Sequence, residues 1–193
     1  MKKIILASAS PRRRDLLDQI GLEFEIKPSD VDESIPENDP IKLVKKLALL
    51  KARDIAQNVE GIVIGADTIV VDDQTILGKP ETREDAFEML KGLSSKQHQV
   101  MTGVAVIDTE SDREWVDFGI TQVFFRSLSD AEINDYIDSG EPMGKAGSYA
   151  IQEKGALFVE KIEGDFFNVV GLPLVKMAEL LKEIDANILA PVK

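Results

Sequence analysis

The sequence predicts an α/β fold with a mixed, strongly twisted sheet, arranged in two lobes with a central cleft. Apolar strand-like segments and amphipathic helix-like segments are interspersed along the 193 residues without a strict strand–helix–strand rhythm. Apolar residues make up 44% of the chain, which is enough for a packed core. The sequence shows no internal repeat, low-complexity segment or obvious linker, so we expect residues 1–193 to form a single domain.

Capping and turn signals mark the expected elements. Ser10 caps a first helix that begins at Pro11 and ends at Gly21. Thr82 with Asp85 resembles a capping arrangement, and Ser129 with Glu132 forms an S-x-x-E capping box. The expected strands are 3–7, a strand end at 24–26, 61–73 (either one buried strand or two pieces interrupted at 65–67), 99–108 and 114–128, with further short strands within 141–173. The expected helices are 11–20, 40–58, 83–93, 130–140 and 174–184.

Composition and charge exclude several classes of function. The formal net charge of −12 is opposite to that of a general duplex-binding protein, and it counts against a nucleic-acid-processing enzyme. No apolar run approaches the roughly 20 residues of a membrane span, and the N-terminal apolar run is too short for a secretory signal. The chain has no cysteine, so a metal would need oxygen ligands or the single His98. We therefore expect a cytoplasmic protein that binds neither nucleic acid nor membrane.

The densest positive charge lies where the first strand meets the first helix. The small residues Ala7 to Ser10 would let a ligand approach the backbone, and a helix N-terminus offers free N–H groups to phosphate. Arg12 and Arg13 add planar donors in the first turn, where positive charge opposes the helix dipole. This pattern favours an anion site, although it is not a P-loop. An ordinary capped helix with solvated arginines is the alternative.

Two charged residues fall within apolar patterns. Lys51 lies on the apolar stripe of the second helix, seven residues after Val44, so its ammonium either reaches an anion in a cleft or turns outward to solvent. Asp67 interrupts a strand-like apolar run, where a carboxylate is costly to bury alone. It could bind a divalent metal or activate water, or it could be a bulge carboxylate bonded to backbone N–H groups.

Three further candidates carry weaker signals. The acidic loop containing Asp30, Asp32 and Glu33 could supply a second oxygen ligand to magnesium. Lys79, in the turn between Gly78 and Pro80, could point at a phosphate, and Gln152 could read the edge of a base with its amide. A solvated loop, a surface lysine and a hairpin glutamine are the respective alternatives. His98 has no partner cluster nearby in sequence, so we assign it a structural role.

Five segments taken together resemble the Maf family of nucleoside triphosphate pyrophosphatases. In family order they are LASASPRRRDLL, GADTIVV, GKP, EPMGKAGSYAIQ and GDFFNVVGLPL, which span Leu6 to Leu174. The resemblance implies the α/β fold of the inosine triphosphate pyrophosphatases, with a nucleotide between two lobes. It implies hydrolysis of a nucleoside triphosphate to its monophosphate and pyrophosphate, with a divalent cation (Mg²⁺, Mn²⁺ or Co²⁺). It also implies a homodimer.

The same resemblance assigns roles to residues. Asp67 matches the proton acceptor, and Glu33 with Asp67 matches the metal ligands. The residues that match the phosphate site are Ser10, Arg13, Lys51 and Lys79, and those that match the base-selecting positions are Arg12, Thr68 and Gln152. This last set of residues resembles the set found in the family branch that takes dTTP and UTP, rather than in the branch that prefers 7-methyl-GTP. A nucleotide-binding regulator of cell division with little turnover would use the same site and is the alternative.

Overall fold

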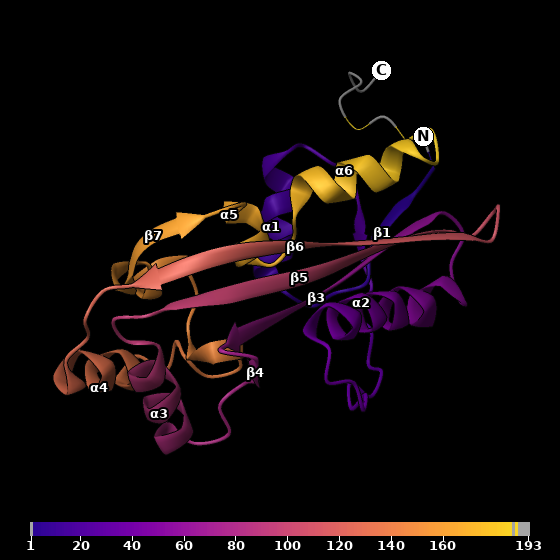
Figure 1. Cartoon of the computed structure of the whole chain (residues 1–193). Coiled ribbons are helices and arrows are strands. Elements are labelled where there is room, and N and C mark those ends of the chain that lie inside the picture. Colours follow the sequence, from indigo (N-terminus) through magenta and orange to yellow (C-terminus); the bar gives the residue numbers. More distant parts are fainter. Residues whose placement is uncertain (1, 187, 189–193) are drawn as a thin grey trace. The chain divides into compact units, whose positions relative to one another are not determined.

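The strands of the computed structural model, which describes residues 2–186 and 188, form one mixed sheet of seven strands. Their order is β2-β1-β3-β5-β6-β7, and β4 pairs with β3 (Figure 1). β1 runs parallel to β2 and β3, whereas β4 is antiparallel to β3 and β7 is antiparallel to β6. The strands are β1 Ile4–Leu6, β2 Glu25–Ile26, β3 Ile62–Asp72, β4 Thr75–Leu77, β5 Gln97–Asp108, β6 Arg113–Phe125 and β7 Val159–Glu163. The predicted mixed α/β class is confirmed.

The helices begin where the capping signals predict. Ser10 caps α1, and the pairs Thr82–Asp85 and Ser129–Glu132 form reciprocal capping boxes for α3 and α4. The helices are α1 Pro11–Gln19, α2 Pro40–Ala56, α3 Arg83–Leu93, α4 Asp130–Asp138, α5 Phe166–Val170 and α6 Leu174–Lys182, with short 3₁₀ turns η1 Ala146–Ser148 and η2 Glu153–Phe158. Within residues 2–186 and 188, no helix has both the length and the apolar character that crossing a membrane requires.

The chain divides into two compact units, in agreement with the two lobes expected. The first contains the chain up to Asp67, Thr102–Gly119 and the chain from Gly171 onward. The second contains Thr68–Met101 and Ile120–Val170. The first unit therefore carries β1, α1, β2, α2 and α6, and the second carries β4, α3, α4, β7 and α5.

In the first unit, α2 packs directly onto β3 and β5. A Cβ atom on Gly65 of β3 would lie 2.3 Å from the Ala48 carbonyl oxygen, and one on Gly103 of β5 would lie 2.1 Å from the Val44 carbonyl oxygen. Only glycine permits contacts of this kind between a strand and a helix backbone. Figure 1 shows α2 on one face of these strands and α6 on the other.

Two expectations about local structure are wrong. β3 is one continuous strand over Ile62–Asp72, so the two-piece alternative interrupted at 65–67 is wrong, because Gly65 serves the packing of α2 rather than a strand break. The segment 141–173 holds one described strand, β7, together with η1, η2 and α5, instead of several short strands. Glycines with positive φ, at 144, 147, 164 and 171, repeatedly turn the chain there.

The second unit has an aromatic core around His98. The ring of His98 packs edge-on against Phe125 and Tyr149, and its Nε2 atom lies 2.7 Å from the Tyr149 hydroxyl oxygen. The side chain is buried, which lowers the pKa of His98 to about 4. These contacts give His98 the structural role expected from the sequence.

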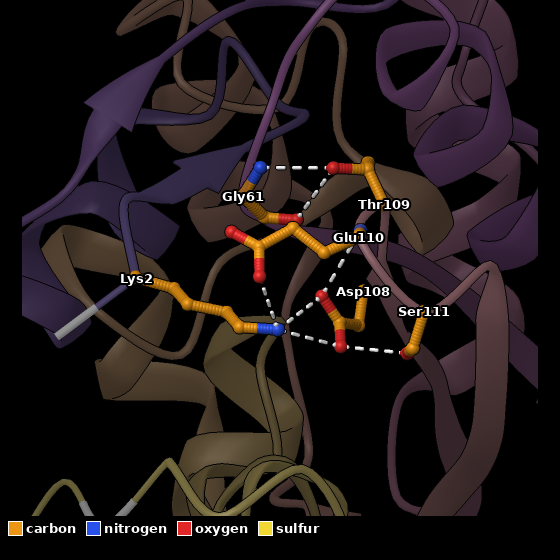
Figure 2. Close-up of polar contacts among 6 residues, drawn as sticks. All are labelled: Lys2, Gly61, Asp108, Thr109, Glu110 and Ser111. Carbon is orange, nitrogen blue, oxygen red and sulfur yellow. Dashed lines mark hydrogen bonds and ion pairs between the residues drawn. The ribbon is translucent and has the colours of Figure 1, made fainter.

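A polar clasp holds the beginning of the chain to the end of β5 (Figure 2). The Lys2 ammonium lies 2.9 Å from both carboxylate oxygens of Asp108 and 3.0 Å from Glu110. Beside it, the Thr109 hydroxyl accepts a hydrogen bond from the Gly61 N–H and donates one to the Gly61 carbonyl. The clasp secures the start of β1, which leads into the helix that carries the arginines.

Candidate active site

Arg13 is a buried anchor of the first unit rather than part of a solvated arginine run. It lies in the first turn of α1 and is only 9% exposed. Its Nε–H donates to the Gly171 carbonyl at 2.7 Å, and its Nη1–H donates to the Ser8 hydroxyl at 3.1 Å. Arg14, by contrast, is exposed and pairs with its neighbour Asp15. The helix start therefore holds one guanidinium in a fixed, largely dry position.

Lys51 and two carboxylates form the centre of the site. The Lys51 ammonium lies 2.6 Å from Oδ1 of Asp67 and 2.9 Å from Oε1 of Glu33. The Lys51 side chain is 12% exposed and the Asp67 side chain 9%, whereas Glu33 reaches in from an exposed loop. Lys51 thus meets anionic partners instead of turning outward. The Asp67 carboxylate is paired with a lysine ammonium, rather than being bonded only to backbone N–H groups.

The packing of α2 on β3 explains how this pair forms. Residues 65 and 67 of a strand point to the same face, so Asp67 faces the helix that Gly65 allows to approach. That approach is made through Ala48 and Ala52. Lys51 lies in the turn between these two alanines, and the close contact brings its side chain to Asp67.

The arginines and carboxylates of the first unit share one electrostatic environment. Burial lowers the pKa of Arg13, the nearby Asp67 and Glu33 raise it, and Arg12 lowers it further. The structure therefore brings Glu33, Lys51 and Asp67 into direct contact, and the charges of Arg12, Glu33 and Asp67 act on Arg13 at the start of α1. Three cations face two carboxylates, so the cluster has a net positive charge suited to a polyanion.

The donor set also fits a divalent cation. The Glu33 and Asp67 oxygens converge on one ammonium, so they are no farther apart than the sum of its two contact distances. Magnesium in nucleotide sites commonly takes one or two protein carboxylates and fills its remaining positions with phosphate oxygens and water. Among the described residues, no group of three or more His, Cys, Asp or Glu side chains could hold a metal alone. A cation here would therefore depend on a bound ligand for most of its coordination.

Only one residue of the acidic loop joins this cluster. Asp32 accepts a hydrogen bond from the Ser34 N–H at 2.9 Å, which stabilises a local turn and lowers the pKa of Asp32. Glu33, the next residue, reaches Lys51. The loop is therefore neither simply solvated nor a multi-carboxylate site.

Three predicted site residues belong to the second unit. Thr68 directly follows Asp67 on β3 and is half-buried. Lys79 is exposed in a turn that is held by a hydrogen bond from the Gly147 N–H to the Gly78 carbonyl. Gln152 is half-buried and immediately precedes η2. Their roles in ligand binding stay predictions.

Sequence reasoning missed two residues that hold Arg13. The sequence predicts a role for Ser8 only through its small size, yet its hydroxyl accepts hydrogen bonds from the Arg13 guanidinium and, at 3.2 Å, from the Ser10 N–H. Gly171 has a φ of 124°, which favours glycine, and it presents its carbonyl to Arg13. The only signal in the sequence was its place in the GDFFNVVGLPL segment, because a backbone acceptor leaves no side-chain pattern.

Comparison with known proteins supports this architecture. One neighbour among solved structures is a HAM1 protein from Coxiella burnetii, with a TM-score of 0.55 and 17% identity. The match covers 95% of this chain and 100% of that chain, which shows a shared fold.

Curated relatives cover nearly the whole chain. The dTTP/UTP pyrophosphatase of Alkaliphilus oremlandii is 53% identical over 98% of this chain and 100% of its own length. The protein of the same name from Acetivibrio thermocellus is 52% identical over 98% of both chains. The family model described as Maf-like protein matches residues 3–184. The chain therefore belongs to the Maf family.

Proposed function

We propose that the protein is a nucleoside triphosphate pyrophosphatase that hydrolyses dTTP and UTP to the monophosphate and pyrophosphate. The observation that carries this proposal is the Lys51 ammonium held between Asp67 and Glu33, beside the buried Arg13. The cluster combines cations for phosphate with carboxylates for a metal and for water. The names of the relatives supply the pyrimidine substrates.

In this proposal the triphosphate lies over the start of α1. The positive end of that helix, the Ser10 hydroxyl and the Arg13 guanidinium bind phosphate oxygens, together with Lys51 and Lys79. Ser8 and Gly171 fix the guanidinium before the nucleotide arrives. Most of the catalytic effect would then come from positioning and from preorganised positive charge.

The carboxylates have two tasks. Glu33 and Asp67 would hold a divalent cation (Mg²⁺, Mn²⁺ or Co²⁺), which when bound offsets charge on the phosphate oxygens. Asp67 orients a water molecule and accepts its proton while the water oxygen attacks the α-phosphorus. The bond from the α-phosphorus to the bridging oxygen breaks, and pyrophosphate leaves with that oxygen. Lys51 keeps the Asp67 carboxylate in place for this transfer.

Base choice is assigned to Arg12, Thr68 and Gln152. Arg12 lies next to Arg13 at the start of α1, and its charge acts on Arg13. Thr68 follows the proposed proton acceptor Asp67 in the chain, and Gln152 offers one donor and one acceptor group to the edge of the nucleobase.

We further propose a cytoplasmic homodimer in which residues 1–193 act as one domain. Cell fractionation and light scattering would test these two points.

A pyrophosphate-release assay tests the proposed activity. A panel of canonical and modified triphosphates is incubated with Mg²⁺, Mn²⁺ or Co²⁺, and we expect release chiefly from dTTP and UTP. Activity confined to purine nucleotides would contradict the substrate assignment. Tight nucleotide binding with negligible turnover would instead support a regulator of cell division, and cleavage of DNA or RNA strands would support a nucleic-acid-processing enzyme.

Asp67→Asn tests the proton acceptor directly. The substitution keeps the shape of the side chain but removes its ability to take a proton, so we expect turnover to fall about 10²–10⁴-fold. Asp73→Asn, in the exposed turn that follows β3, makes the same chemical change outside the site and is the matched control. Near-normal turnover in Asp67→Asn, with Asp73→Asn also normal, would remove Asp67 from this role.

A further inference from the structure

The segment from Ala150 to Gly155, which carries Gln152, is a loop whose two ends meet. A Cβ atom on Gly155 would lie 2.2 Å from the Ala150 carbonyl oxygen, so only glycine allows this contact. Glu153, directly after Gln152, has a φ of 62°, in the left-handed region that few non-glycine residues adopt. Such a backbone is retained only where the surroundings determine it strongly. Something outside the loop must therefore hold it.

The Glu141 carboxylate holds the C-terminal end of the loop. One of its oxygens, Oε1, accepts a hydrogen bond from the Gly155 N–H at 3.0 Å. The other, Oε2, accepts one from the Lys154 N–H at 3.2 Å. Hydrogen bonds from backbone N–H groups to an ionised carboxylate are stronger than those between neutral groups.

Tyr136 of α4 strengthens this hold. Its hydroxyl donates to Oε1 of Glu141 at 2.8 Å. The same hydroxyl oxygen lies 2.9 Å from where a Cβ of Gly155 would stand. Tyr136 is buried, packed edge-on against Phe158, so its position is fixed. Glu141 and Tyr136 thus hold the C-terminal end of the loop, which itself lies against the Ala150 carbonyl.

We propose that Glu141 is a positioning residue that fixes the Ala150–Gly155 loop and thereby sets the preference for the base. The proposal rests on the proposed function, in which the Gln152 amide contacts the base edge. An amide can distinguish bases only when its oxygen and nitrogen are held in place, because rotation exchanges donor and acceptor. Glu141 does not touch the base in this account, and it acts through the loop backbone.

Glu141→Gln tests the proposal with little change in shape. The amide retains one acceptor oxygen but directs an NH₂ group at a backbone N–H, so the loop loses part of its hold. We expect the ratio of kcat/KM for dTTP over that for CTP or GTP to fall about tenfold. The loss should appear mainly as a raised KM for dTTP and UTP, with kcat little changed. Glu153→Gln, an exposed carboxylate in the same loop, is the charge-matched control and should keep the ratio.

A double-mutant cycle shows whether Glu141 acts through Gln152. Gln152→Ala should lower the same ratio, and adding Glu141→Gln to it should cause little further loss, because the two changes remove one interaction. Tyr136→Phe removes the hydroxyl but keeps the ring, and it should shift the ratio in the same direction. This third variant decides the matter if Glu141→Gln does not fold.

Four results would overturn the inference. They are an unchanged ratio in both Glu141→Gln and Tyr136→Phe, an equal loss for every base, additive effects in the cycle, and an unchanged ratio in Gln152→Ala. Each variant is compared with a wild-type enzyme that releases pyrophosphate from dTTP. If the wild-type protein hydrolyses no triphosphate, the proposed function itself fails, and that outcome is distinct from the four.

Discussion

At the scale of single residues, Lys51 shows how a cation can be kept inside the apolar face of a helix. Burying an ammonium alone is costly, and the cost is offset only when partners of opposite charge are fixed nearby. Asp67 on β3 and Glu33 on a loop provide those partners from two separate segments. The lysine in turn keeps two carboxylates close together that would otherwise repel each other.

Lys51→Met removes the charge and keeps an apolar chain of similar length. We expect triphosphate affinity to fall at least about tenfold, because a charge-assisted contact to phosphate is lost. Isothermal titration with a slowly hydrolysed dTTP analogue measures the change. Lys46→Met on the same helix is the control, since Lys46 is exposed and pairs with Glu37 outside the cluster. Equal affinities for the two variants would exclude Lys51 from phosphate binding.

At the scale of elements, the contact of α2 with β3 decides the geometry of the site. The contact depends on glycine at position 65, where the helix backbone occupies the space a side chain would need. A short shift of α2 away from the strand would separate Lys51 from Asp67. Under the proposed function, the packing of one helix would therefore couple stability to catalysis.

Gly65→Ala forces that shift. We expect the free energy of unfolding to fall by about 1–3 kcal/mol, typical of an overpacked core, and turnover to fall with it. Gly92→Ala in α3 is the matched control, because no atom lies within 4 Å of its added Cβ. Alanine should there raise stability by about 0.5–1 kcal/mol through better helix propensity. Urea denaturation measures both, and an unchanged stability for Gly65→Ala would refute the close contact.

The elements also show which local features can be predicted from sequence. The helices α1, α3 and α4 begin as expected because their capping residues bond to N–H groups three positions away. The break at Gly65 that the sequence allows is absent, because a glycine in a strand pattern predicts a break and a close packing contact equally well. What distinguishes the two is the position of α2, which local sequence does not contain.

At the scale of the whole molecule, a single buried histidine makes stability depend on pH in the range between 7.5 and 5. His98 is the only histidine of the chain, and its pKa of about 4 in the folded protein lies below the ordinary value of 6.5. The unfolded chain therefore binds a proton at a higher pH than the folded protein does. The stabilising contribution of neutral His98 is complete above pH 6.5 and is lost as pH falls toward 4.

Between pH 7.5 and pH 5 this difference should lower the free energy of unfolding by about 2 kcal/mol. Ordinary carboxylates titrate below this range, so their contribution is small. His98→Gln, which can still hydrogen-bond to the Tyr149 hydroxyl, removes the titrating group and should flatten the profile. Denaturant midpoints at several pH values measure both curves. A wild-type profile that is already flat, or a His98→Gln profile that falls as steeply, would contradict the prediction.

For the molecule as a whole, the sequence predicts which residues belong to the candidate site better than it predicts which residues contact one another. Apolar patterns singled out Lys51 and Asp67 because charged residues in such patterns are costly. That the two would meet, with Glu33 beside them, could not be read from spacing, since three separate segments are involved. The seven-stranded order of the sheet and the anchors of Arg13 likewise depend on long-range pairing.

The bond from Arg13 to Gly171 has a consequence for how the protein is made. It joins positions 158 residues apart, so a growing chain completes its first helix long before the acceptor for that helix's buried guanidinium has been synthesised. Until the ribosome has delivered Gly171, Arg13 lacks one of the contacts that fix it. Under the proposed function, chains that end before Gly171 should therefore bind nucleotide more weakly than chains that contain it.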